Sequence, residues 1–122
     1  MKILLVDDHT PTREHVEVLL RNETDMNVVA AVGSAEEALE ADSRLLPDIV
    51  VMDIMLPEMN GIEAIRRILS VRPDARILVL SNHSGTVLMQ AVMEAGGLGY
   101  VSKNRANEEL IPAIRAIAAD ES

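Results

Sequence analysis

The sequence predicts an α/β fold, a three-layer doubly wound (βα)5 sandwich in which a parallel sheet lies between two layers of helices. The first observation is a set of short apolar runs that are continuous rather than alternating, as is typical of strands buried on both faces of a parallel sheet. The second is that a segment with helical periodicity separates each run from the next, so right-handed crossovers place helices on both faces. The runs are Ile3–Val6, Val28–Val32, Ile49–Met52, Ile77–Leu80 and Tyr100–Val101.

Capping signals mark where the helices between these strands begin. Ser34 and Glu37 form a capping box, in which each side chain satisfies the free amide of the other. Pro11 occupies the first helical position after Thr10, where a missing N–H costs nothing. Pro112 is expected to bend the first turn of the last helix. The helices are expected to begin at Thr10, at Ser34, at Asn60 with Glu63 three residues on, near Ser84 and near Asn107.

The length and composition fit one domain, residues 1–122, with no linker and no output domain in the chain. Hydrophobic residues make up 48% of the chain, but Phe and Trp are absent and Tyr100 is the only aromatic residue, so the core must be aliphatic. No apolar run approaches the roughly 18 residues that a membrane helix needs. The N-terminus has the pattern of a strand rather than of a signal peptide, and no membrane association is expected.

Acidic residues outnumber basic residues by 20 to 11, and the formal net charge is −9. A nucleic-acid backbone is bound through a basic surface, so direct nucleic-acid binding by this chain is not expected. Cysteine is absent, which excludes disulfides and thiolate metal sites. Most of the acids are explained by solubility, and the exceptions are three that follow predicted strands.

Polar residues follow four of the five predicted strands. The carboxyl ends of parallel strands meet at one edge of the sheet, where ligands of open α/β sheets bind. Each residue alone has an ordinary explanation as a helix cap, a turn residue or a solvated side chain, but their combination on one edge predicts a functional site. Asp7 and Asp8 follow the first strand, Asp53 the third, Ser81 the fourth and Lys103 the fifth.

These residue types suit the transfer of a phosphoryl group. Three neighbouring carboxylates repel one another unless they bind a cation or a proton, and hard carboxylate oxygens favour Mg²⁺ or Mn²⁺. Lys103 offers a positive charge and Ser81 a hydroxyl donor to phosphoryl oxygens. A carboxylate with such neighbours, here Asp53, is placed to become an aspartyl-phosphate.

Four segments resemble the receiver domains of two-component response regulators, and the resemblance covers essentially the whole chain. The opening Val6-Asp7-Asp8-His9 and the later Ser81-Asn82-His83 are most similar to the NarL/FixJ-type subfamily. The resemblance implies a flavodoxin-like sheet with strand order 2-1-3-4-5. The matching segments are Ile3–His9, Asp48–Gly61, Ile77–Ser81 and Ala95–Lys103.

The resemblance implies that the domain receives a phosphoryl group from a sensor histidine kinase or a phosphotransfer domain. The change would pass to a partner or output surface that controls transcription, in the cytoplasm. Such a domain is not an enzyme, because it performs only self-catalysed phosphotransfer and autodephosphorylation. NarL-type proteins usually carry a C-terminal helix-turn-helix domain, so the chain is either an excised receiver or a stand-alone one.

The acidic residues receive specific roles from the resemblance. It implies that Asp53 is the phospho-acceptor. Asp8 and Asp53 would bind Mg²⁺ directly, together with the backbone carbonyl of Met55. Asp7 would act mainly through a metal-bound water.

The resemblance also implies residues that respond to the phosphoryl group or tune its lifetime. Ser81 and Lys103 would contact the phosphoryl oxygens, and Ser81 would form a switch pair with Tyr100. Met55 and His83 occupy variable positions beside the acceptor and are expected to set how fast water reaches it. Asn82 stands where a small Ala is usual, and is expected to narrow access to Asp53.

A partner surface is predicted on the fourth helix, which has almost no polar face. A helix that is apolar all round is either buried on both sides or used as an interface. We expect a homodimer or an output-domain contact through residues 84–95 and 107–118. The apolar residues of this helix are Val87, Leu88, Met89, Ala91, Val92, Met93 and Ala95.

Three other functions agree less well with the sequence. An aspartate-nucleophile phosphohydrolase needs a second acid two residues after the nucleophile, and Met55 stands there. A flavodoxin-like flavin binder needs a hydroxyl-rich phosphate loop and aromatic residues to stack the flavin. A phosphorylation-independent binding module would not need the acceptor, the acids and the lysine, all of which are present.

Overall fold

The computed structural model describes residues 1–82 and 85–119, and these form one parallel sheet with the strand order β2-β1-β3-β4-β5. All four neighbouring strand pairs are parallel. The predicted α/β class and the implied strand order are both confirmed. The strands are β1 (Lys2–Val6), β2 (Asn27–Val32), β3 (Ile49–Met52), β4 (Ile77–Ser81) and β5 (Gly99–Ser102).

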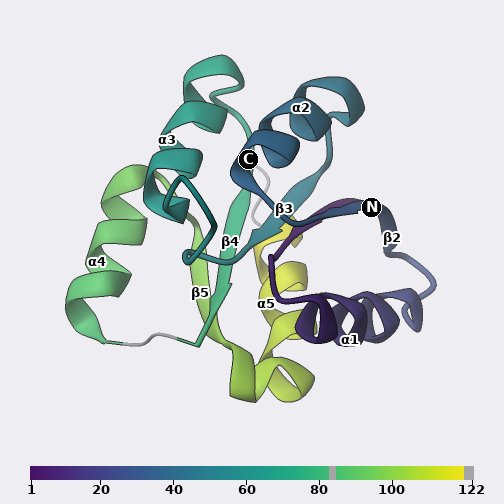
Figure 1. Cartoon of the computed structure of the whole chain (residues 1–122). Helices are drawn as coiled ribbons and strands as arrows, with labels where there is room; N and C mark the ends of the chain where they lie inside the picture. Colours follow the sequence, from purple (N-terminus) through teal and green to yellow (C-terminus); the bar gives the residue numbers. More distant parts are fainter. Residues whose placement is uncertain (83–84, 120–122) are drawn as a thin grey trace.

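Helices cover both faces of the sheet, as Figure 1 shows. Helices α1 (Thr10–Arg21) and α5 (Ala106–Ala119) pack on one face, and α2 (Ala35–Leu45), α3 (Gly61–Val71) and α4 (Thr86–Ala95) pack on the other. A short 3₁₀ helix, Lys103–Arg105, joins β5 to α5. Among the described residues, no helix is both long enough and apolar enough to cross a membrane.

The core consists of two aliphatic clusters, one on each side of the sheet. Strand residues alternate between them: Leu4 and Val6 face α2, α3 and α4, whereas Ile3 and Leu5 face α1 and α5. Strands β1, β3 and β4 are buried almost completely, which explains why their sequences are continuous apolar runs. The two outer strands are less buried, and their sequences contain more small or polar residues.

The capping signals place the helix starts to within one residue. The Ser34 hydroxyl accepts a hydrogen bond from the Glu37 amide at 3.2 Å, but the Glu37 carboxylate bonds to the Ser34 hydroxyl instead of returning to its amide. The predicted capping box is therefore only half formed. The Asn60 side chain caps α3 as expected, with 2.9 Å to the Glu63 amide.

The first helix begins at Thr10 as expected, but its cap differs. Thr10 is already helical in α1, so His9 takes the cap position and Pro11 is the second helical residue instead of the first. The cap of α4 is Gly85, and the predicted start near Ser84 lies outside the described residues.

The last helix begins at Ala106, one residue before the predicted Asn107. Asn107 instead pairs with His15, at 2.8 Å between Oδ1 and Nε2, and so connects α5 to α1. Pro112 is the seventh residue of α5 and lies in its second turn, not in its first. The side chain of Pro112 is exposed, so water can hydrate the carbonyl that lacks a helical partner.

Candidate functional site

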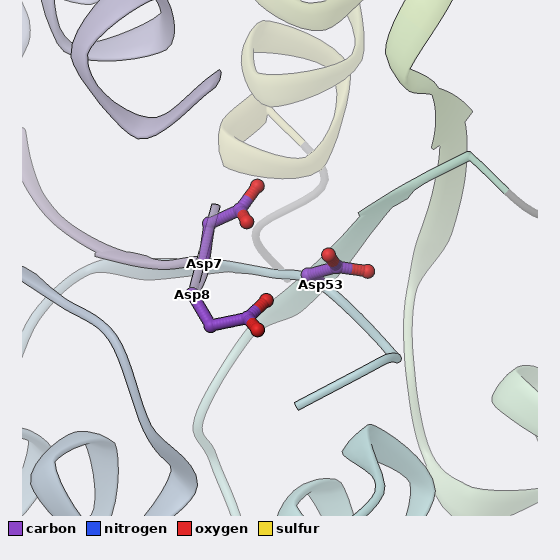
Figure 2. A group of neighbouring side chains, drawn as sticks. All are labelled: Asp7, Asp8 and Asp53. Atoms are coloured by element: carbon purple, nitrogen blue, oxygen red, sulfur yellow. The ribbon is translucent and has the colours of Figure 1, made fainter. Parts of the chain in front are cut away.

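The three predicted acids lie together at the carboxyl edge of the sheet. Val6 and Met52 are register partners in adjacent strands, so Asp7 and Asp53 leave the sheet side by side. Backbone bonds fix both positions, with 3.0 Å from the Asp7 amide to the Val32 carbonyl and 2.9 Å from the Asp53 amide to the Val6 carbonyl. One oxygen each from Asp7, Asp8 and Asp53 lies within 4.8 Å of the others (Figure 2).

Lys103 bridges two of these carboxylates. Its Nζ lies 2.8 Å from Asp7 Oδ2 and 2.7 Å from Asp53 Oδ2, and its side chain is 8% exposed. Burial lowers the pKa of the Lys103 ammonium, but the hydrogen bonds and charges of Asp53 and Asp7 outweigh burial and raise that pKa above its ordinary value. Lys103 is therefore a fixed positive charge beside the proposed acceptor.

Backbone amides hold the remaining carboxylate oxygens of the buried pair. The His9 amide donates to Asp7 Oδ1 at 2.9 Å, and the Met55 amide donates to Asp53 Oδ1 at 3.1 Å. Asp7 and Asp53 are 2% and 5% exposed, whereas Asp8 is exposed to solvent. The orientation of both buried carboxylates is thus determined before any ligand binds.

The donor set fits a small divalent cation. Three carboxylates carry three negative charges, and the Lys103 ammonium compensates only one of them. All three side chains offer hard oxygen ligands, the type that Mg²⁺ prefers. The exposed Asp8 leaves the cluster open to solvent on one side, so an ion can enter without rearrangement of the sheet.

The two residues of the predicted switch pair lie on adjacent strands. Ser81 ends β4 and is fully buried, and Tyr100 lies in β5, which pairs with β4. The Tyr100 hydroxyl is buried and has no hydrogen-bond partner within residues 1–82 and 85–119. Burial raises the pKa of the Tyr100 hydroxyl above its ordinary value, and the charge of Asp53 raises it further. The Ser81 hydroxyl, which lies nearby, has the opposite effect and lowers this pKa.

Two of the three expected tuning positions lie in the described part of the chain. The Met55 side chain is 54% exposed beside Asp53. Asn82 is exposed and lines a shallow cavity of about 340 Å³ together with His15 and Lys103. His83 lies outside the described residues.

Two further residues at this edge were not predicted from the sequence. Arg13, on α1, donates a hydrogen bond of 2.7 Å from Nη1 to the backbone carbonyl of Asp7. Gly61 lies so close to the segment after β3 that a Cβ there would be 2.6 Å from Ile54 Cα. The sequence marks Gly61 only as part of the Asp48–Gly61 segment, and no spacing or cap signal indicates Arg13.

Residues 3–115 match the family model described as the response regulator receiver domain. The chain belongs to this family. The match includes all three acids, Ser81 and Lys103. The receiver domain has the flavodoxin-like fold that the resemblance implied.

Relatives of known name support the NarL- and LuxR-type assignment. The chain is 36% identical over 118 residues to the transcriptional regulatory protein DegU of Brevibacillus brevis, covering 97% of this chain and 50% of that protein. It is 37% identical over 122 residues to the DNA-binding transcriptional activator DevR/DosR of Mycobacterium tuberculosis, covering 100% and 56%. The receiver domain thus spans about half the length of these relatives.

A solved structure agrees with the same assignment. The crystal structure of a two-component response regulator of the LuxR family from Aurantimonas sp. has a TM-score of 0.93 and 42% sequence identity to this receiver domain. The alignment covers 97% of this chain and 84% of that structure.

Proposed function

We propose that Asp53 of this receiver domain accepts a phosphoryl group from a sensor histidine kinase or a phosphotransfer domain. The observation that carries the proposal is the buried Lys103 ammonium, held 2.7 Å from Asp53 beside two further carboxylates. An Asp53 oxygen would attack phosphorus while the phosphorus–nitrogen bond to the donor imidazole breaks. The products would be an aspartyl-phosphate and a free imidazole, which takes a proton from solvent.

The surrounding residues would stabilise the transferring group. Asp8, Asp53 and the Met55 carbonyl would hold Mg²⁺, with Asp7 acting through a bound water; when bound, the ion neutralises charge on the phosphoryl oxygens. The Lys103 ammonium would exchange its bond to Asp53 for one to a phosphoryl oxygen. The Ser81 hydroxyl would donate to another phosphoryl oxygen.

The output would be a change in surface instead of turnover of a substrate. Movement of Ser81 toward the phosphoryl group, followed by the Tyr100 ring, would alter the surface of α4, β5 and α5. The named relatives are transcriptional regulators, which supports a role of this surface in the control of transcription. The domain would act in the cytoplasm. Residues 1–122 would act as one regulatory domain in this scheme.

Phosphorylation of Asp53 is tested by intact mass after incubation with acetyl phosphate and Mg²⁺. The native chain should gain one phosphoryl group, and Asp53→Asn should gain none because its amide is not a nucleophile. Asp74→Asn, a matched change at an exposed acid, should behave as the native chain does. A native chain that gains no mass would favour a phosphorylation-independent binding module, and phosphorylated Asp53→Asn would contradict the assigned acceptor.

The exposed apolar side of α4 is proposed as the contact to a second copy of the chain or to an output domain. Val92 is fully buried, but Val87, Met89 and Met93 are 82%, 47% and 51% exposed. Met89 and Met93 lie one turn apart on the same side of α4, whereas Val87 lies on a different side. Contiguous exposed apolar patches commonly mark interaction sites, so the proposed contact centres on Met89 and Met93.

Replacing Met89 or Met93 by Glu is expected to weaken self-association of the phosphorylated chain about tenfold, because a carboxylate would be buried against apolar surface. Sedimentation velocity over a concentration series measures the effect. Gln90→Glu adds the same charge at a polar, exposed position of α4 and should change association little. Equal sedimentation of the native chain and both Met variants would contradict the homodimer.

A further inference from the structure

Arg13 contacts the acidic site through the backbone of Asp7. Its Nη1 donates to the Asp7 carbonyl oxygen at 2.7 Å, and the contact is partly buried. Arg13 is the fourth residue of α1, and its own amide bonds to the His9 carbonyl at 3.0 Å, so its backbone is held in the first turn of the helix. The Arg13 side chain thus connects α1 to the segment after β1 that contains Asp7 and Asp8.

Gly33 provides the space that this guanidinium occupies. A Cβ at Gly33, the residue that follows β2, would lie 3.0 Å from Arg13 Nη1 and 3.9 Å from both the Asp7 oxygen and the Asp8 Cα. Such a contact is tight enough that the guanidinium would have to move by a few tenths of an ångström. The fit of Arg13 against Asp7 therefore depends on the absence of a side chain at residue 33.

The hydrogen bond from Arg13 holds the peptide group between Asp7 and Asp8 in one orientation. The Asp7 amide is fixed on Val32, and its carboxylate is held by the His9 amide and by Lys103. Arg13 fixes the Asp7 carbonyl, which lies in the same peptide plane as the Asp8 nitrogen and Cα. The direction in which the Asp8 side chain leaves the backbone follows from that plane.

We propose that Arg13 is a positioning residue for divalent-cation binding, because it orients the Asp7–Asp8 peptide so that the Asp8 carboxylate faces Asp53. The inference rests on the proposed function, in which these carboxylates hold Mg²⁺. Groups that orient metal ligands from outside the ligand set commonly change metal affinity by about 10- to 100-fold when removed.

The charge of Arg13 and its hydrogen bond predict opposite results, which makes the proposal testable. A guanidinium near three carboxylates repels an incoming cation, so charge alone predicts that Arg13→Ala binds Mg²⁺ more tightly. Loss of positioning predicts weaker binding. The sign of the change in affinity therefore separates the two roles.

The test is isothermal titration of the full chain with Mg²⁺, alongside thermal unfolding in EDTA. Arg13→Ala is expected to weaken Mg²⁺ binding about tenfold. Arg13→Lys, which keeps the charge but loses the planar guanidinium, should bind with intermediate affinity. Gly33→Ala keeps the Arg13 charge but displaces the guanidinium, and should weaken binding several-fold. Arg67→Ala removes an exposed arginine that pairs with Glu63 on α3, and should bind as the native chain does.

The outcomes distinguish this inference from the function on which it rests. Unchanged or tighter Mg²⁺ binding by Arg13→Ala would overturn the positioning role, and so would unchanged binding by both Arg13→Lys and Gly33→Ala if Arg13→Ala does not fold. A merely structural role would lower the unfolding temperature in EDTA without changing the Mg²⁺ dissociation constant. Failure of the native chain to bind Mg²⁺ would instead contradict the proposed cation site itself.

Discussion

Replacement of Lys103 by methionine is expected to lower the free energy of unfolding by about 3 kcal/mol in the absence of Mg²⁺. The variant keeps the length and apolar stem of the side chain but removes the charge that bridges Asp7 and Asp53. Two carboxylates exposed by only 2% and 5% would then face each other without that cation. Chemical denaturation in EDTA measures the difference.

The pH dependence of this difference follows from the raised pKa of Lys103. Because the ammonium has a higher pKa in the folded chain than in the unfolded chain, its stabilisation is complete below the ordinary lysine pKa, about 10.4. The stabilisation is lost as the pH rises through the higher folded-state value. The gap between the native chain and Lys103→Met should therefore stay constant near neutral pH and shrink only in strongly alkaline solution.

Two comparisons support the interpretation of Lys103→Met. Lys2→Met removes an exposed ammonium that donates to the Leu45 carbonyl, and should change stability by less than about 1 kcal/mol. Added Mg²⁺ should stabilise Lys103→Met more than the native chain, since the ion supplies the missing positive charge. If Lys103→Met loses no more free energy of unfolding than Lys2→Met, the fold does not depend on the bridge between Asp7 and Asp53.

Phosphorylation of Asp53 should also slow at least about 10²-fold in Lys103→Met, because the ammonium would no longer stabilise the phosphoryl oxygens.

Replacement of Asp42 by alanine is expected to lower the free energy of unfolding by about 3 to 5 kcal/mol. Asp42, on α2, binds Arg72 through two bonds, 2.7 Å to Nη2 and 3.2 Å to Nε, and the two side chains are 3% and 18% exposed. The hydrogen bonds that Arg72 donates to Asp42 raise the pKa of the guanidinium, and burial opposes this rise. Arg72 stays charged even without Asp42, because an arginine is protonated at ordinary pH in any environment. The Pro47 carbonyl, 3.1 Å from Nη2, would remain as a weaker partner.

An exposed ion pair gives the matched control for Asp42→Ala. Glu40 and Arg44 both lie on α2 and form an ion pair of 3.0 Å, but each side chain is 61% exposed. Glu40→Ala should therefore change stability by less than about 1 kcal/mol. The double variant Asp42→Ala/Arg72→Met should recover part of the loss, because no buried charge is left uncompensated. Equal effects of Asp42→Ala and Glu40→Ala would contradict the argument.

The strands could be predicted closely because a parallel sheet requires continuous apolar runs. Residues Ile49–Met52 agree at both ends, and the other strands extend by one residue at one or both ends. The added residues are polar or glycine, such as Asn27, Ser81 and Gly99, and backbone pairing includes them although hydrophobicity does not indicate them.

The grouping of the acids at one edge could be predicted from the geometry of a parallel sheet, but the contact of Arg13 with the backbone of Asp7 could not. Once Asp7 and Asp53 are assigned to the ends of parallel strands, the fold brings them together without knowledge of side-chain packing. Arg13 acts on a backbone carbonyl across a space left by Gly33, and that contact depends on how α1 sits beside β2. No periodicity or capping rule carries this information. Ser81 and Tyr100 were predicted as a switch pair, but only the structure shows that the Tyr100 hydroxyl is buried without a partner among the described residues.

The aliphatic core has a spectroscopic consequence. Since the sequence contains no Trp and no Phe, all near-ultraviolet absorption and fluorescence of the side chains come from Tyr100. That single chromophore lies on β5, its hydroxyl is buried, and the Asp53 charge contributes to its raised pKa. The emission and the alkaline absorbance titration of the unlabelled protein therefore report on one location, the side chain of Tyr100 on the strand next to Ser81.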